Sequence, residues 1–570
     1  MHFTAFNVLP LTLETMKLYV YNTTRKESQV TLWGLSESDK VAVHIKNLKT
    51  SICVETQTPL EHARLLRETA KLAEMNEVHF RHEKVAYKTL SSNERLVPMT
   101  KITMEPFIKK DLINHLRCQN FVLHDTDNDI MTDLHTVYGF SCCTWVWVDP
   151  SATKAPSRNA QTGLFEYCVT LKDLDFHRFS EDKSIPRMKC CSIDIETCGE
   201  RKDGVGAVQY SSELRDPCVF VQLSFWSLNE SAMSQYNEDA IVPIRYEGIL
   251  SDTIKTPLII FWLCRTEAFM IGSEKKLIDS TAPGSPLDNK ISPCRVISRR
   301  VEVVTTEREL LMQMQRCIVR ESPEIMTGFN IMQFDLPCLL ERSNAVVQED
   351  CNWNPRWFNP ADESSDNLAY PLREGESHPL CWSLDGSKLK ITKKTVTTNQ
   401  AGARAKNRVE NASMLFLDIL PYAFDYMKLD RYTLNSVVAH ELGSMSKVDL
   451  SGGHDSIHTM LHGDDNTRLK LIRYSCVDSE LCCLLFEKLL IYSFYGGLAV
   501  ASGPSPGMLQ TRGQQFMVRT LFVRQCVESQ VVLPFSVAKR DYGTFKGATV
   551  VSPETRFWED PIVTVDFSAM

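Results

Sequence analysis

The chain has 570 residues, which is enough for about three to four domains of ordinary size. Hydrophobic residues make up 43% of it, so large buried cores can form, and only 24 glycines and 25 prolines exclude collagen-like and Pro/Gly-rich disordered classes. The formal net charge of −8 argues against a simple basic protein that coats nucleic acid, but it leaves room for an enzyme with a local basic track.

Apolar runs, the first residues and the cysteines indicate in which compartment the protein would be found. The longest apolar run, residues 258–264, is too short to span a bilayer, and the first residues lack the basic start of a secretory signal. The 19 cysteines include no CxxC pair, which fits free thiols in a reducing compartment. We therefore expect a protein that is neither secreted nor bound to a membrane.

Residues 1–186 are predicted to form an N-terminal domain of mixed α/β type. Alternating, β-branched and aromatic stretches predict strands at 17–22, 29–34 and 144–149. An amphipathic pattern predicts a helix over 59–75. No pattern in this part of the sequence points to a catalytic site.

Residues 187–492 are predicted to form a second α/β domain. The expected strands are 188–196, 219–226, 258–264, one that ends at Gly328 and one that ends at Asp418, and the expected helices are 306–320, 432–443 and 468–490. Strands with interleaved helices favour a mixed α/β sheet. The polar stretches 273–295 and 353–387 are predicted to be loops or insertions.

Charge singles out residues 386–409, which contain seven basic residues and no acid. The alternating pattern predicts a β-hairpin with a turn near Gln400. Charge alone leaves two alternatives equally open, a hairpin that faces solvent and one that contacts phosphates. The second alternative selects four residues, which we call the hairpin cations: Lys393, Lys394, Arg404 and Lys406.

Two carboxylates end the predicted strand 188–196. Asp194 and Glu196 are two residues apart, so both side chains project from one face of the strand. Two like charges so close are costly unless cations neutralise them, and hard oxygen donors suit Mg²⁺ or Mn²⁺. An Asp-x-Glu pattern also arises by chance, however, and it recurs at Asp478 and Glu480.

Two further patterns add polar groups. In residues 327–335 a strand ends at Gly328, Asn330 follows, and Asp335 stands at a predicted helix start, where it could equally be a helix cap. Tyr474 and Asp478 are four residues apart on a predicted apolar helix and so share a face, although a surface pair would have the same spacing. Four such carboxylates can hold two divalent ions about 4 Å apart, which predicts metal-assisted hydrolysis of phosphodiesters.

Taken in order, DIE at 194–196, GFNIMQFD at 328–335 and YSCVD at 474–478 resemble the three exonuclease motifs of DEDDy 3′–5′ proofreading nucleases. The surrounding sequence resembles family B DNA polymerases, and polymerase delta in particular. TRGQQ at 511–515 is similar to the approach to the palm domain, and PIVTVDF at 561–567 is similar to the approach to polymerase motif A. We therefore expect residues 493–570 to begin a palm domain and the chain to be the N-terminal part of a longer polymerase.

The resemblance implies a fold, metals and a site. The fold would be α/β, with an N-terminal mixed α/β domain, a ribonuclease-H-like DEDDy exonuclease domain and the first strands of a palm. Two Mg²⁺ (or Mn²⁺) ions would bind at the exonuclease site, and Tyr474 would position the attacking water. The implied metal ligands are Asp194, Glu196, Asp335 and Asp478 in the exonuclease, and Asp566 in a polymerase site whose other carboxylates the sequence lacks. The residues implied to line the primer 3′ end are Phe329, Asn330 and Phe334.

The same resemblance implies partners and leaves alternatives. The partners would be DNA primer-template, deoxynucleoside triphosphates for the full-length enzyme, and a sliding clamp or processivity factor. The location would be the nucleus or an intracellular viral replication site, and divergent loops would fit a large DNA virus. One alternative is a stand-alone DEDDy 3′–5′ exonuclease, which would not need residues 511–567. The other is a catalytically inactive scaffold derived from a polymerase.

Overall fold

The computed structural model describes most of the chain between residues 16 and 534. The ranges left out within it are 27, 37–38, 91–94, 150–156, 159–163, 199–216, 229–261, 273–274, 280–294, 350–389, 399–401, 411–412 and 443–453, and residues 556, 557 and 559 are described beyond it. The predicted loop 353–387 and the turn near Gln400 therefore lie outside the described residues. So do the predicted palm residues after 534, Asp566 among them, apart from 556, 557 and 559.

The N-terminal region contains two sheets, where the sequence predicted one module. The larger sheet has seven strands in the order β11-β8-β1-β2-β3-β10-β9. Their bounds are β1 Met16–Lys26, β2 Gln29–Ser36, β3 Asp39–Ile45, β8 Thr144–Val148, β9 Ser157–Arg158, β10 Phe165–Val169 and β11 Leu174–Asp175. The strands predicted at 17–22, 29–34 and 144–149 are β1, β2 and β8.

The second N-terminal sheet has five strands in the order β21-β5-β6-β4-β7. The strands are β4 Thr50–Glu55, β5 Arg81–Thr89, β6 Leu96–Met104, β7 Leu123–His124 and β21 Val531–Val532. The helices beside it are α1 Pro59–Asn76, the short η1 Pro106–Ile108, α2 Lys109–Cys118 and α3 Ile130–Thr136. Thr58 and Glu61 form a capping box at the start of α1, which explains why the helix begins where the sequence predicted it.

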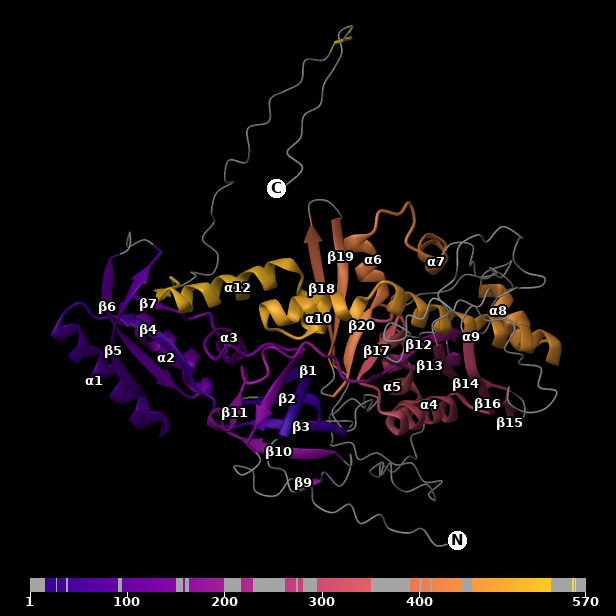
Figure 1. The fold of residues 1–570 in the computed structure, drawn as a ribbon, viewed down its shortest axis with the longest axis horizontal. Helices are drawn as coiled ribbons and strands as arrows, with labels where there is room; N and C mark the ends of the chain where they lie inside the picture. The colour runs from indigo at the N-terminus through magenta and orange to yellow at the C-terminus, as the bar shows by residue number, and fades with distance from the viewer. Residues whose placement is uncertain are drawn as a thin grey trace.

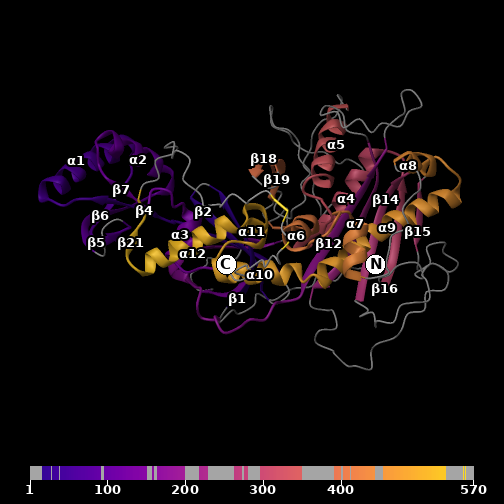
Figure 2. The same cartoon turned by 90° about the horizontal axis from the view of Figure 1, so that it is seen from above.

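The segment after residue 490 returns to the N-terminal region. It forms α10 Ile491–Ser502, α11 Pro506–Arg512 and α12 Gln514–Glu528. α12 packs against α3, where Arg524 Nη2 donates to the His135 carbonyl at 3.1 Å, and β21 pairs in parallel with β5. In the segment predicted as a palm domain, α12 and β21 thus lie with the N-terminal sheets, while α11 packs on the strand that ends at Asp418, where Gln510 Nε2 donates to the Asp418 carbonyl at 2.8 Å. α9, α10 and α12 extend along the long axis toward the N-terminal sheets (Figures 1 and 2).

The second domain is built on a seven-stranded sheet in the order β15-β16-β14-β13-β12-β17-β20. The strands are β12 Met188–Thr197, β13 Cys218–Leu228, β14 Trp262–Ile271, β15 Lys276–Asp279, β16 Arg295–Val304, β17 Ile325–Gly328 and β20 Leu415–Asp418. β13 runs antiparallel to β12 and β14, whereas β17 runs parallel to β12 and β20. The mixed α/β sheet predicted from the sequence is confirmed.

One strand prediction and one loop prediction in this sheet were wrong. β14 continues past Arg265 to Ile271, beyond the apolar run 258–264 from which the strand was predicted. It does so because it pairs with β13 on one side and β16 on the other, and these backbone hydrogen bonds hold the more polar residues in the strand. β15, Lys276–Asp279, lies inside the stretch predicted to be a loop. It is a short edge strand that pairs with β16, and such a polar strand forms only where a partner is present.

Helices cover both faces of this sheet. They are α4 Glu307–Glu321, α5 Asp335–Glu349, α6 Ile419–Tyr426, α7 Leu434–Leu442, α8 His454–Leu461 and α9 Asp465–Lys488. Cys191, Ile193 and Ile195 of β12 pack into the core with α4 and α5, while α9 crosses the other face of the strands (Figure 1). Because side chains alternate along a strand, Asp194 and Glu196 face α9.

The predicted basic hairpin is present as a two-stranded sheet. β18, Lys390–Thr398, pairs with β19, Gly402–Glu410, and Lys394 stands opposite Lys406 in the register. Ile391 and Val409 pack against the core of the second domain, so the base of the hairpin is anchored there.

Within the described part of the chain, no single helix is both long and apolar enough to cross a membrane. α9 and α10 meet that test only as a pair, which bends by 46° at its break. The cysteines whose side chains are described are free thiols, as expected.

Candidate active site

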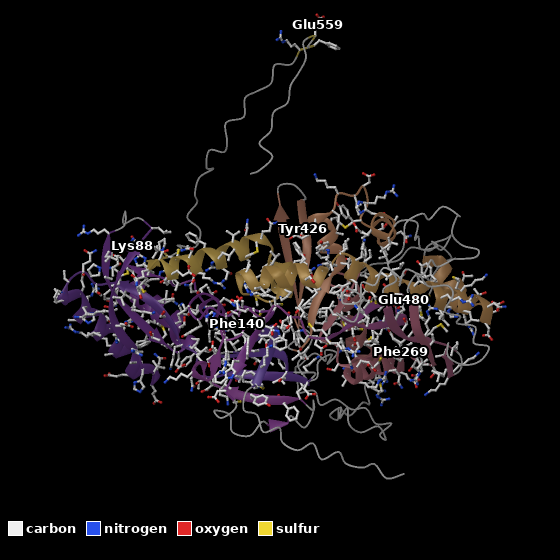
Figure 3. The ribbon with its side chains drawn as sticks, in the orientation of Figure 1. Lys88, Phe140, Phe269, Tyr426, Glu480 and Glu559 are labelled. Atoms are coloured by element: carbon white, nitrogen blue, oxygen red, sulfur yellow. The ribbon has the colours of Figure 1, made fainter. Side chains whose placement is uncertain are left out.

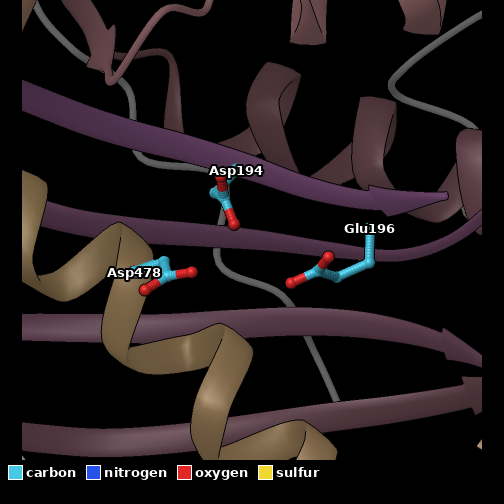
Figure 4. A group of neighbouring side chains, drawn as sticks. All are labelled: Asp194, Glu196 and Asp478. Carbon is cyan, nitrogen blue, oxygen red and sulfur yellow. The ribbon is translucent and has the colours of Figure 1, made fainter. Parts of the chain in front are cut away.

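Three carboxylates meet where α9 crosses β12. Asp194 and Glu196 come from the strand and Asp478 from the helix, and each offers an oxygen within 4.8 Å of the others (Figure 4). The two strand acids are half-buried, whereas Asp478 is only 5% exposed. Three like charges at this spacing repel one another, and a bound cation would offset that repulsion.

The two acids of the second Asp-x-Glu pattern, Asp478 and Glu480, have different roles. Residues two apart share a face on a strand, but on a helix they lie about 200° apart. Glu480, which is labelled in Figure 3, therefore points away from Asp478 and is fully buried. It forms a bidentate ion pair with Arg299 of β16 at 2.7 and 2.9 Å. Thr266 Oγ1 also donates to Glu480 at 3.1 Å. This pair ties α9 to the sheet and so sets the position of Asp478.

Asp335 reaches the site from a third element. It is the first residue of α5, is 2% exposed, and its Oδ1 accepts a hydrogen bond from the Ile195 backbone N–H at 3.2 Å. Burial raises the pKa of Asp335 to about 8, and the negative charges of Asp418 and Glu196 add to the effect. Asp335 thus lies beside the two strand acids, although it is not part of the three-carboxylate group.

The loop that carries the second motif is held by a residue that the sequence did not single out. Asp418, fully buried at the end of β20, accepts backbone hydrogen bonds from Asn330 at 2.8 Å and Met332 at 3.0 Å. Burial raises the pKa of this carboxyl to about 6. Asn330 adopts a left-handed backbone with φ of 69°, a strained conformation that these bonds stabilise. An acid at the end of a buried strand was the only signal for this role.

Gly328 is required by close packing at the same loop. A Cβ atom there would lie 2.4 Å from Ile331 Cγ2 and 2.5 Å from the Ile193 carbonyl oxygen. The glycine in the second motif therefore allows the loop to pass directly over β12.

The remaining predicted site residues lie on α9, on the loop of the second motif and on the hairpin, except for Asp566. Tyr474 is half-buried and lies one helical turn before Asp478, while Phe329, Asn330 and Phe334 are half-buried in the loop. The hairpin meets this loop through Asn407, whose Nδ2 donates to the Met332 carbonyl at 3.2 Å. The backbone positions of the hairpin cations are in β18 and β19, and Asp566 lies outside the described residues.

The donor chemistry of the site fits hard divalent cations. The four acids supply only carboxylate oxygens, which are the ligands that Mg²⁺ and Mn²⁺ prefer, and no thiol or imidazole is among them. A cation would also offset the repulsion within the cluster and the cost of ionising the buried Asp335.

Comparison with known families identifies the chain. The family described as "DNA polymerase family B, exonuclease domain" matches residues 125–367, and "DNA polymerase family B" matches residues 507–570, together more than half of the chain. The chain belongs to the family B DNA polymerases. The first match contains the two strand acids and Asp335 but not Asp478. The resemblance to this family is confirmed.

Curated relatives place the family B chain near polymerase delta. It is 27% identical over 276 residues to the DNA polymerase delta catalytic subunit of Caenorhabditis elegans, 30% over 267 residues to that of Glycine max and 29% over 282 residues to that of Bos taurus. These alignments cover 46–49% of this chain and 22–23% of the relatives. The chain therefore matches less than a quarter of their length.

A solved structure supports the fold. The family B DNA polymerase from the archaeon Pyrobaculum calidifontis aligns with a TM-score of 0.58 at 16% identity, over 94% of this chain and 53% of the archaeal one. The mixed α/β architecture is thus that of a family B polymerase across nearly all of the chain.

Proposed function

We propose that this chain carries the 3′–5′ proofreading exonuclease of a DNA polymerase and hydrolyses phosphodiesters at the primer 3′ end. The convergence of Asp194, Glu196 and Asp478 within 4.8 Å carries this proposal. The match of residues 125–367 to the exonuclease domain of family B DNA polymerases supports it, because that range contains Asp194, Glu196 and Asp335.

The proposed cofactor is Mg²⁺, with Mn²⁺ as a substitute, and two ions at the site. Asp194, Glu196 and Asp478 would hold them through oxygen. Asp335, whose Oδ1 accepts the Ile195 N–H beside the two strand acids, would be the fourth ligand. Bound cations would supply an activated water and would stabilise the leaving 3′-oxygen. Tyr474, one turn from Asp478, would form a hydrogen bond with that water and so orient it.

DNA is the proposed substrate of this site. Phe329 and Phe334 can stack on the terminal bases, and Asn330, whose backbone Asp418 fixes, can hold the sugar or phosphate. The hairpin cations would contact the phosphate backbone, because the hairpin base is joined to the same loop through Asn407.

The longer protein is proposed to be a replicative polymerase. The match of residues 507–570 to "DNA polymerase family B" favours a polymerase over a stand-alone exonuclease. Its substrates would be primer-template DNA and deoxynucleoside triphosphates, with Asp566 as one metal ligand of the polymerase site. A sliding clamp or processivity factor is a further proposal, drawn from the resemblance to the family. So is a location in the nucleus or at an intracellular viral replication site.

The decisive experiment removes the two strand acids. The Asp194→Ala/Glu196→Ala chain should degrade 5′-labelled single-stranded DNA in Mg²⁺ slower than the unaltered chain by orders of magnitude, because the cations lose two ligands. Asp430→Ala is the matched control, since Asp430 is exposed and ends a Tyr-x-x-x-Asp pattern of the same spacing. Degradation at the unaltered rate by the double variant would end the proposal.

A second pair of variants tests the water-orienting role. Tyr474→Phe should slow hydrolysis less than the loss of two ligands does, because it removes one hydroxyl and no carboxylate. Tyr426→Phe should have no effect, although Tyr426 precedes Asp430 with the same spacing as Tyr474 precedes Asp478. Equal rates for both variants would remove Tyr474 from the mechanism.

A further inference from the structure

A buried amide lies against the first strand acid. Gln222 of β13 stands directly opposite Asp194 in the antiparallel register, and its Nε2 donates to Asp194 Oδ2 at 3.1 Å. Gln222 is fully buried, and its Oε1 has no hydrogen-bond partner among the described residues. A half-satisfied buried amide costs stability, so a fold that retains one calls for an explanation.

The orientation of that amide is set by charge. If the amide were reversed, its oxygen would face the Asp194 carboxylate and two acceptors would repel each other. The observed orientation therefore satisfies Asp194 at the expense of the Gln222 oxygen.

A buried hydroxyl lies against the second strand acid. Ser475 of α9 is fully buried, and its Oγ donates to Glu196 Oε1 at 3.1 Å. Ser475 stands between Tyr474 and Asp478 in the sequence, so the helix that supplies one carboxylate also holds another. Each of the two strand acids thus receives a bond from a neutral donor on a different element.

Neutral donors suit carboxylates that must bind cations. A hydrogen bond to one oxygen fixes the side-chain rotamer and leaves the other oxygen available to a metal. It also favours the ionised form of the acid. A lysine or arginine in the same place would neutralise the acid and compete with the cation, which neither Gln222 nor Ser475 does.

We propose that Gln222 and Ser475 are positioning residues that hold Asp194 and Glu196 in their metal-binding geometry. The inference rests on the proposed exonuclease function. It says that the two donors orient the metal-binding carboxylates before DNA binds. Outer partners of this kind typically contribute about 10–100-fold to metal affinity.

The test measures metal binding directly, in the full chain without DNA, by the electron paramagnetic resonance signal of free Mn²⁺. Gln222→Met keeps the side-chain length and removes the donor, and Ser475→Ala removes the hydroxyl. Each should weaken Mn²⁺ binding about tenfold or more, and each should raise the Mg²⁺ concentration needed for half-maximal hydrolysis more than it lowers the rate at saturating Mg²⁺. Ser475→Thr, which keeps the hydroxyl, should restore binding.

Ser479→Ala is the matched control. Ser479 is equally buried on the same helix, one turn further on, but its hydroxyl bonds to Ser224 rather than to a site carboxylate. It should leave Mn²⁺ affinity unchanged. If Ser475→Ala and Gln222→Met bind Mn²⁺ within twofold of the unaltered chain, the positioning role is wrong. If Gln222→Met does not fold, the comparison of Ser475→Ala with Ser475→Thr decides alone.

The outcomes also separate this inference from the proposed function. An unaltered chain whose Mn²⁺ binding is the same as that of Asp194→Ala/Glu196→Ala would overturn both. A chain that binds Mn²⁺ through those acids and degrades DNA, but does not respond to the two donors, would overturn only the positioning role.

Discussion

Replacing Arg299 by Met should loosen α9 from the sheet of the exonuclease domain. The side chains of Arg299 and Glu480 are 4% and 0% exposed, and they meet through two hydrogen bonds of 2.7 and 2.9 Å. Methionine has a similar shape but no charge, so the variant leaves the Glu480 carboxylate buried with Thr266 but without its cation.

The expected size of the effect follows from this burial. Removing one partner of a buried ion pair costs about 3–5 kcal/mol, since the remaining charge is neither solvated nor paired. Replacing both residues, as Arg299→Met/Glu480→Met, should cost far less, because apolar side chains of similar volume often substitute for a buried pair without loss. The two single changes should therefore be strongly non-additive.

Hydrogen exchange of the α9 amides measures this directly. A loss of 3 kcal/mol in the free energy of opening would speed their exchange by about 100-fold in Arg299→Met, at roughly tenfold for each 1.4 kcal/mol, with near-normal protection in the double variant. DNA hydrolysis should fall in the single variant too, because α9 carries Asp478. Normal protection in Arg299→Met, or no recovery in the double variant, would refute the reasoning.

Three further outcomes are expected. Gly328→Ala should lower the free energy of unfolding by about 1–3 kcal/mol and reduce exonuclease activity, since its Cβ would lie 2.5 Å from the Ile193 carbonyl oxygen; unchanged denaturant unfolding and activity would contradict this. Replacing the four hairpin cations by Ala should weaken DNA binding and flatten the slope of log affinity against log salt by up to about four units, whereas an unchanged slope would favour a hairpin that only faces solvent. His135 is buried, and burial lowers its pKa to about 4, below the 6.5 of the unfolded chain. The neutral side chain therefore favours the folded state above pH 6.5, and about 3 kcal/mol of the free energy of unfolding should be lost as the pH falls toward 4. Urea unfolding at pH 7 and pH 5 should show a smaller pH dependence in His135→Gln, and an equal dependence would count against this assignment.

Local patterns were enough to predict much of the site. The two-residue period of β12 puts Asp194 and Glu196 on one face, and the four-residue spacing on α9 does the same for Tyr474 and Asp478. Such periodicities depend only on the backbone geometry of one strand or helix, so they can be predicted from the spacing of residues in the sequence. The same reasoning predicted the hairpin of β18 and β19, whose alternation is local.

Contacts between distant segments lay beyond those patterns. β21 joins a sheet whose other strands lie more than 400 residues earlier, and β15 forms only beside β16. The pairing partner of an edge strand is a property of the assembled sheet, so neither strand had a signal in its own residues.

The sequence by itself determined which carboxylates could act and the local faces on which they stand, because those follow from residue type and from the repeat of a strand or helix. Only the tertiary structure decided that Asp478 faces β12 while Glu480 pairs with Arg299, and that Asp418 holds the loop of the second motif. It also brought Gln222 and Ser475 to the two strand acids. The physical reason is that each of these is a buried polar contact between separate elements, and burial selects the partner only when the elements have packed.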